Sequence, residues 1–271
     1  MNKSDLMRHL EQAESVRRKM ISVADHCQEK IHWASSLSCV EILLYIMSEA
    51  SNFADEKADD SCRDILIVSK GHAALAQYAV MNELGLIGDD FVTQYQKNGS
   101  DYPEELIKDK GLHIECSTGS LGLGLPYAVG KAILFKRRGI NKKIFCIVGD
   151  GECDEGSVWE ALMLAGQHKL NNIILVIDFN GLQADGSTDE IIAWNNMQKQ
   201  IEAFGWQALA VDGHSFEELD KAFESITDKP TAVIAKTIKG KGISFMENDY
   251  SWHDRILNKD LLRQAKMEIG L

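Results

Sequence analysis

The feature that most constrains the fold of this chain is a pair of polar turns, each close behind a short apolar run. Gly149-Asp150-Gly151-Glu152 directly follows the run 144–148, and Asn180 lies three residues after the run 173–177. Short apolar runs bounded by turns are typical of parallel strands buried on both faces. Because the carboxyl ends of such strands meet at one edge of a sheet, Asp150 and Asn180 are expected to converge there.

Oxygen ligands dominate this expected site. A carboxylate and a side-chain amide suit a hard divalent cation such as Mg²⁺, which often takes phosphate oxygens as its remaining ligands. Glycines on both sides of Asp150 let the backbone approach a ligand closely. The two turns therefore predict a site for a diphosphate held through a metal ion.

Strands and helices are predicted to alternate along most of the chain. Apolar runs predict strands at 65–68, 144–148, 173–177, 207–211 and 232–236. Periodic apolar positions predict helices at about 6–27, 37–47, 73–84, 125–137, 158–168, 191–204 and 216–226. This pattern indicates an α/β fold, a doubly wound and mostly parallel sheet with helices on both faces. Without a linker rich in Pro, Gly or Ser, residues 1–271 are predicted to form a single domain.

The composition argues against two classes of partner. The chain has 41 acidic and 29 basic side chains and a formal net charge of −12, whereas nucleic acids and anionic membranes select basic surfaces. Its apolar runs are too short for a membrane span or a signal peptide. The six cysteines form no Cys-x-x-Cys pair and no zinc-type cluster. These features predict a cytoplasmic protein with reduced thiols.

Three histidines lie beside small residues in predicted loops: His32, His72 in Ser69-Lys70-Gly71-His72, and His253 in Tyr250-Ser251-Trp252-His253. Read in order with the segment 115–122 and the metal motif, these segments resemble the N-terminal half of transketolase. The resemblance runs from about residue 5 to residue 258 and is closest to the small subunit of two-gene transketolases. It implies thiamine-diphosphate-dependent transfer of a two-carbon ketol unit from a ketose to an aldose.

The resemblance also implies roles for individual residues. His32, His72 and His253 would be catalytic and line the cleft above the thiazolium ring, where an imidazole can donate or accept a proton near neutral pH. The metal, Mg²⁺ or else Ca²⁺ or Mn²⁺, would be held by Asp150, Asn180 and the backbone carbonyl of Leu182. Residues around the cofactor would be His72, Gly119, Leu121, Gly151, Glu152 and Asn180. Glu155 and Glu160 would lie near the subunit interface and help to link two cofactor sites.

One loop departs from the family pattern. Family members usually carry a His-Pro pair before the segment that begins at Glu115, and here the loop reads Gly99-Ser100-Asp101-Tyr102-Pro103-Glu104. Either Tyr102 replaces that histidine, or His113 reaches the cofactor from a shifted position.

The resemblance further implies a partner. In the family, the glutamate that activates the aminopyrimidine ring belongs to a pyrimidine-binding domain, which has no counterpart in this sequence. A C-terminal transketolase subunit is therefore expected to supply it, in a heterotetramer that contains a homodimer of this chain and acts on sugars or sugar phosphates. Two alternatives are the α subunit of a 2-oxoacid dehydrogenase, which carries a similar metal motif, and a cofactor-binding homologue without catalytic activity.

Overall fold

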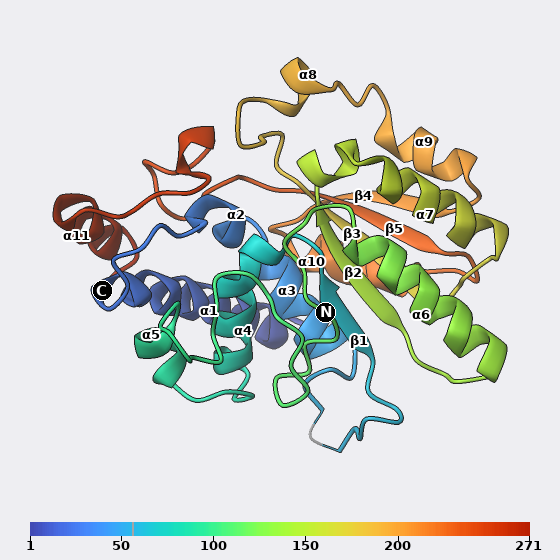
Figure 1. Ribbon diagram of the computed structural model, residues 1–271, viewed down its shortest axis with the longest axis horizontal. Helices are drawn as coiled ribbons and strands as arrows, with labels where there is room; N and C mark the ends of the chain where they lie inside the picture. Colours follow the sequence, from blue (N-terminus) through green and yellow to red (C-terminus); the bar gives the residue numbers. More distant parts are fainter. Residues whose placement is uncertain (56) are drawn as a thin grey trace.

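The computed structural model describes residues 1–55 and 57–271 and shows a sheet with helices on both sides (Figure 1). Within the described residues the sheet has five parallel strands in the order β1-β2-β3-β5-β4. The strands are β1 (Ile65–Val68), β2 (Ile144–Gly149), β3 (Ile173–Phe179), β4 (Gln207–Asp212) and β5 (Thr231–Lys236). Each strand covers a predicted apolar run, so the α/β prediction is confirmed.

Helices cover both faces of this sheet (Figure 1). On one side lie α1 (Lys3–Ser22), α3 (Val40–Tyr45), α4 (Ala74–Glu83) and α10 (Phe216–Glu224). On the other side lie α6 (Gly124–Arg138), α7 (Gly156–Gln167) and α9 (Met197–Ala203). The remaining α-helices are α2 (Trp33–Leu37), α5 (Asp90–Gln94), α8 (Thr188–Ile191) and α11 (Lys259–Glu268). In the part of the chain described, no helix has both the length and the hydropathy of a membrane span.

The two helical layers have separate hydrophobic cores. Successive side chains of a strand point to opposite faces. Phe145 and Ile147 of β2 therefore join the core of α1, α3, α4 and α10, whereas Cys146 and Val148 join that of α6, α7 and α9. Continuous apolar sequence in the strands follows from this burial on both faces.

Several helices are shorter than their sequence patterns predict: α1 ends at Ser22, α3 spans Val40–Tyr45 and α10 ends at Glu224. The largest difference lies before β4. Helix was expected over 191–204, but α8 ends at Ile191 and α9 begins at Met197. The side chain of Asn196 accepts a hydrogen bond from the N–H of Lys199 at 3.0 Å and caps α9, a role that asparagine favours. Trp194, in the intervening segment, stacks on Trp159 with ring centroids 4.9 Å apart. Capping and packing thus outweigh the helical periodicity here.

The carboxyl ends of β1, β2, β3 and β5 meet at one edge of the sheet. The register places Gly149 beside Asp178 and Phe179 beside Lys236. The loops that leave these four strands carry Lys70, Asp150, Asn180 and Lys239. The fold therefore brings Asp150 and Asn180, from distant parts of the sequence, to one edge of the sheet, as the two turns predict.

Candidate active site

The loop after β2 carries the first predicted metal ligand. Asp150 is 2% exposed, and its carboxylate accepts hydrogen bonds from the N–H of Gly151 at 2.8 Å and of Gly181 at 2.5 Å. Burial and the neighbouring Asp178 nevertheless raise the pKa of Asp150 to about 6. A carboxylate that burial destabilises in this way gains from a bound cation.

The loop after β3 carries the other two predicted ligands. The side-chain oxygen of Asn180 accepts from the N–H of Leu182 at 3.1 Å, and the carbonyl of Leu182 accepts from Nζ of Lys239 at 3.1 Å. The Leu182 oxygen thus already faces a cationic group. One carboxylate, one amide and one carbonyl oxygen form a donor set that fits a divalent metal ion.

A cavity joins these loops to two of the predicted histidines. Eight of the predicted site residues line it: His72, Leu121, Asp150, Gly151, Glu152, Asn180, Leu182 and His253. Ser35, Lys70 and Lys239 also line the wall. The cavity thus places the predicted metal ligands beside two imidazoles that can transfer protons.

The three histidines form a compact cluster. The ring centroid of His32 lies 5.1 Å from that of His72 and 5.1 Å from that of His253. The centroids of His72 and His253 are 5.3 Å apart. Burial and nearby lysines lower the pKa of His72 well below its usual value and that of His253 to about 4. Both rings are therefore neutral at pH 7, and each can donate one hydrogen bond and accept another.

Glu152 lines the cavity, but its carboxylate is fully engaged by the protein. It accepts from the N–H of Gly122 at 2.8 Å, from the N–H of Gly149 at 3.2 Å and from the hydroxyl of Ser69. These hydrogen bonds hold the glycine-rich segment 119–124 against the loop after β2, which carries Asp150. Gly119 in that segment has φ 146°, and a Cβ there would lie 2.8 Å from Oε2 of Glu105. A side chain at Gly119 would therefore collide with that of Glu105.

Five predicted site residues do not line this cavity: His32, which lies against His72 and His253, Gly119, Glu155, Glu160 and His113. Glu155 and Glu160 are exposed at the start of α7. Nδ1 of His113 lies 4.0 Å from Asp60 in a different pocket.

Tyr102, the other candidate for the missing loop histidine, is also turned away from the cavity. Tyr102 is 7% exposed, and its hydroxyl donates to Asp90 at 3.4 Å. Neither alternative for that histidine reaches the cavity. The same loop instead brings Glu104 to His32, with 2.8 Å between Oε1 and Nδ1.

Comparison with known proteins identifies the family. The family model for the transketolase, thiamine diphosphate binding domain matches residues 19–271. This chain belongs to the transketolase family. The match confirms the resemblance seen in the sequence, and it does not favour a 2-oxoacid dehydrogenase subunit.

Some transketolase relatives match this chain along nearly their whole length. An apulose-4-phosphate transketolase subunit of Actinobacillus succinogenes is 38% identical over 259 residues, which are 95% of this chain and 94% of that protein. The 6-deoxy-6-sulfo-D-fructose transketolase subunit SqwG of Clostridium sp. is 33% identical over 241 residues, 88% of each protein. Relatives named as transketolase subunits thus share the extent of this chain.

Other transketolases are longer. Human transketolase is 38% identical over 242 residues, which are 88% of this chain and 38% of the human protein. The crystal structure of transketolase from Campylobacter jejuni aligns with a TM-score of 0.85 and 30% identity, over 100% of this chain and 43% of that one. The chain therefore spans less than half the length of these two transketolases.

Two lysines that line the cavity were not indicated by the sequence analysis. Nζ of Lys70 forms a buried ion pair with Asp178 and donates to the carbonyl of Ser35 at 2.7 Å. Lys239 is 2% exposed, and burial, together with Lys70, lowers its pKa to about 8. Both lysines follow a strand by only two or three residues, at the edge that carries Asp150. That position was the available signal, because parallel strands deliver such residues to one place.

Proposed function

We propose that this chain is the diphosphate-binding subunit of a two-component transketolase, which transfers a two-carbon ketol unit from a ketose to an aldose. The observation that carries the proposal is a cluster of three imidazoles, two of which, His72 and His253, line the same cavity as the predicted metal ligands Asp150, Asn180 and Leu182. Membership of the transketolase family supports this reading of the site.

The metal and the diphosphate would occupy the floor of the cavity. Asp150, Asn180 and the carbonyl of Leu182 would hold Mg²⁺, or Ca²⁺ or Mn²⁺, and the metal would carry the diphosphate. Lys239, beside the Leu182 carbonyl, adds positive charge where phosphate charge would accumulate. Gly119, Leu121, Gly151 and Glu152 would complete the wall around the cofactor. When bound, thiamine diphosphate supplies the carbanion chemistry that breaks and forms carbon–carbon bonds.

The histidines would handle the hydroxyl groups and the carbonyl oxygen of the sugar. His72 and His253 have lowered pKa values, so each enters the reaction as a neutral ring that can either take up or donate a proton. His32 lies against both rings and would extend the same set of contacts. Proton transfer by positioned groups of this kind contributes about 10²- to 10⁴-fold to a rate.

A second chain would supply the pyrimidine-binding domain and its activating glutamate. The names of the two relatives of which this chain covers 94% and 88%, each a transketolase subunit, support this division. Residues 1–271 would form one domain, present twice in a heterotetramer of the cytoplasm, with Glu155 and Glu160 near the interface. His113 is left out of the proposed site because it lies in another pocket. The substrates would be sugars or sugar phosphates.

Activity measured with and without the partner tests the proposal. The purified chain should show no ketol transfer alone, and transfer should appear when a C-terminal transketolase subunit is supplied together with thiamine diphosphate and Mg²⁺. In that complex, His72→Ala and His253→Ala should each lower kcat by about 10²-fold or more. Substantial activity of the chain alone would refute the two-component assignment. Inactivity with a bound partner and cofactor would instead favour a non-catalytic homologue.

A further inference from the structure

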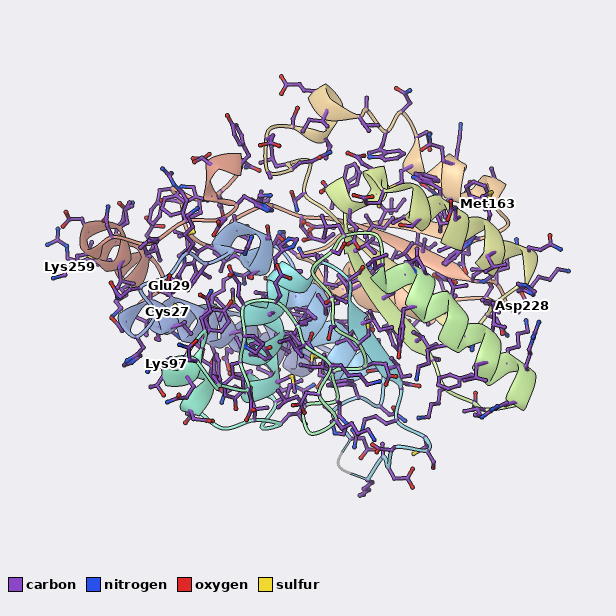
Figure 2. The ribbon with its side chains drawn as sticks, viewed as in Figure 1. Cys27, Glu29, Lys97, Met163, Asp228 and Lys259 are labelled. Atoms are coloured by element: carbon purple, nitrogen blue, oxygen red, sulfur yellow. The ribbon has the colours of Figure 1, made fainter. Side chains whose placement is uncertain are left out.

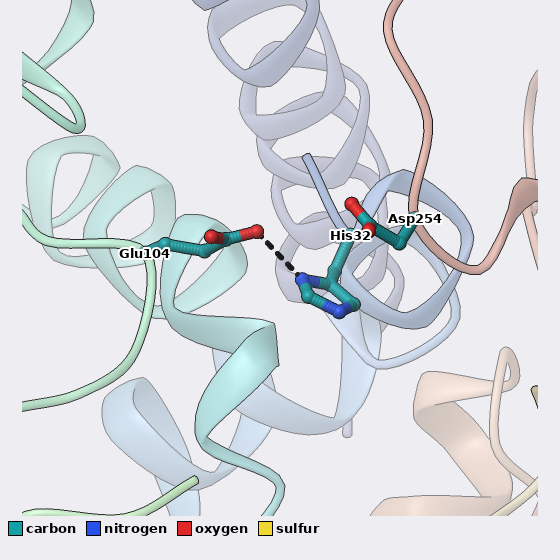
Figure 3. A group of neighbouring side chains, drawn as sticks. All are labelled: His32, Glu104 and Asp254. Atoms are coloured by element: carbon teal, nitrogen blue, oxygen red, sulfur yellow. Dashed lines mark hydrogen bonds and ion pairs between the residues drawn. The ribbon is translucent and has the colours of Figure 1, made fainter. Parts of the chain in front are cut away.

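The carboxylate of Glu104 contacts His32, one member of the histidine cluster (Figure 3). Oε1 of Glu104 lies 2.8 Å from Nδ1 of His32, and the two side chains are 32% and 18% exposed. Asp254 completes a group in which one ligand-type atom from each residue lies within 4.8 Å of the others. His32 is thus placed between an acidic group and the two rings of His72 and His253.

The surrounding fold fixes this contact from both sides. Ile31 and Arg255 form an antiparallel bridge, which ties His32 to the segment of His253. On the other side, Tyr102 packs against the ring of Tyr78 with centroids 5.4 Å apart and anchors the loop that carries Glu104. The buried Tyr102 thereby holds the loop in which Glu104, two residues further along, contacts His32.

The contact determines which nitrogen of His32 bears hydrogen. An ionised carboxylate can only accept hydrogen bonds, so Nδ1 of His32 must donate to Glu104. In a neutral imidazole the other nitrogen, Nε2, then carries the lone pair. Within the described residues, Nδ1 is the ring nitrogen of His32 that has a hydrogen-bond partner. Nε2 is thereby left to the substrate.

We propose that Glu104 is a positioning residue, which holds His32 in the Nδ1–H tautomer and so presents Nε2 to a substrate hydroxyl group as a hydrogen-bond acceptor. The catalytic consequence rests on the proposed transketolase function, whereas the tautomer is a property of this chain. Acceptance of a hydroxyl proton at Nε2 complements the neutral rings of His72 and His253. Without the carboxylate, Nε2 would carry hydrogen and meet the same hydroxyl as a donor.

Asp254 does not compete for this role. Its Oδ2 lies 3.3 Å from Nζ of Lys30, so its charge is matched by an ammonium group. Glu104, by contrast, has His32 as its hydrogen-bond partner in the described part of the chain. We therefore assign the control of the tautomer to Glu104 alone.

Nitrogen-15 NMR of the full chain, labelled at histidine, tests the tautomer directly. Spectra at mildly alkaline pH, where imidazoles are neutral, distinguish the two tautomers, and a His32→Gln spectrum identifies the signals. Wild-type His32 should be in the Nδ1–H form, and Glu104→Leu should convert it to the Nε2–H form. Glu104→Gln, which keeps an acceptor oxygen, should preserve the wild-type form.

Two matched carboxylate variants serve as controls. Asp101→Asn, exposed on the same loop, and Asp254→Asn should both leave the His32 signals unchanged. The signals of the other histidines should show that every variant is folded. An Nε2–H form in the wild type, an unchanged tautomer in Glu104→Leu, or a switch in Asp254→Asn would each overturn the proposal.

Kinetics of the reconstituted complex test the catalytic consequence. Glu104→Leu should lower kcat/KM by about 10- to 100-fold, by analogy with the removal of a carboxylate that orients a metal-bound histidine. The affinity for thiamine diphosphate should not change, and Glu104→Gln should recover most of the activity. Unchanged kcat/KM in Glu104→Leu would contradict the positioning role. An inactive wild-type complex would refute the proposed function but leave the NMR result standing.

Discussion

Asp150 supplies the negative charge among the three proposed metal ligands, since Asn180 and Leu182 offer neutral oxygens. Its position also has a cost for the folded chain: burial and the neighbouring Asp178 raise the pKa of this carboxyl to about 6, so ionisation costs more in the folded chain than in the unfolded one. A bound metal ion would offset this cost. Metal binding through Asp150 would therefore stabilise the folded chain.

Replacing this carboxylate tests the assignment of the metal site. Asp150→Ala should weaken the binding of thiamine diphosphate with Mg²⁺ by about 100-fold or more, while the fold is kept. Calorimetric titration of the complex with its partner measures the affinity, and circular dichroism checks the fold. Asp185→Ala, exposed in the neighbouring loop, is the matched control. An affinity equal to that of the control would remove Asp150 from the proposed metal site.

Glu105 illustrates a different consequence of burial. Burial raises the pKa of Glu105, Glu104 adds to this effect and His32 opposes it. Its Oε2 is buried and has no hydrogen-bond partner within the described residues. Because the folded chain holds this proton more tightly than the unfolded chain, the associated stability is present below the unfolded pKa and lost as pH rises through the folded pKa.

Removing this titration should therefore flatten the dependence of stability on pH. Glu105→Gln stays neutral, so its free energy of unfolding should fall less than that of the wild type as pH rises from about 4 to 7. Urea unfolding at several pH values measures the difference, with Asp101→Asn as an exposed control on the same loop. A pH dependence identical to the wild type would show that Glu105 titrates alike in both states.

At the scale of elements, the strands could be predicted closely from the sequence. Runs such as 144–148 and 173–177 are continuous because each strand is buried on both faces, and this burial leaves a direct mark on composition. The same logic placed Asp150 and Asn180 at one edge. The helix expected over 191–204 was less predictable, since the capping by Asn196 competes with an apolar periodicity of similar strength.

Side chains on loops could not be placed in this way. The direction of Tyr102 depends on aromatic packing against Tyr78 and Phe91, and that of His113 on Phe53. Such contacts join segments distant in sequence and leave no periodic pattern. For the same reason the sequence did not indicate Glu104 as the partner of His32, although His32 was a predicted site residue and Glu104 lies in the loop that departs from the family pattern.

Replacement of two glycines by alanine, one in α6 and one in α7, should have opposite effects on the free energy of unfolding. A Cβ on Gly166 of α7 would lie 1.8 Å from the carbonyl oxygen of Phe204, whereas one on Gly130 of α6 would meet no neighbour within 4 Å among the described residues. Gly166→Ala should therefore destabilise the chain by about 1–3 kcal/mol or more. Gly130→Ala should stabilise it by up to about 1 kcal/mol through helix propensity. Urea unfolding of both variants provides the measurement, and shifts of the same sign would contradict the packing described for α7.

The whole molecule presents an apolar surface along α6 and α7, which lie side by side (Figure 1). Its exposed members are Leu123, Leu134, Met163 and Leu164. Exposed apolar patches on soluble proteins often mark interaction sites, and Glu155 and Glu160 lie at the start of the same helix α7. We expect this surface to take part in assembly, in a closed two-fold arrangement.

A charge placed on this surface tests its role in assembly. Met163 is 49% exposed on the outer side of α7 (Figure 2), so Met163→Glu should leave the isolated chain folded. If Met163 is buried on assembly, losing its contribution of about 1.5–3 kcal/mol should raise the dissociation constant by about tenfold or more. Light scattering of the chain, alone and with its partner, gives the mass at each concentration. Met267→Glu, at a 67% exposed methionine of α11, should not change the mass. Assemblies of equal mass and affinity for both variants would exclude the α6–α7 surface from the interface and require the two-fold axis to lie elsewhere.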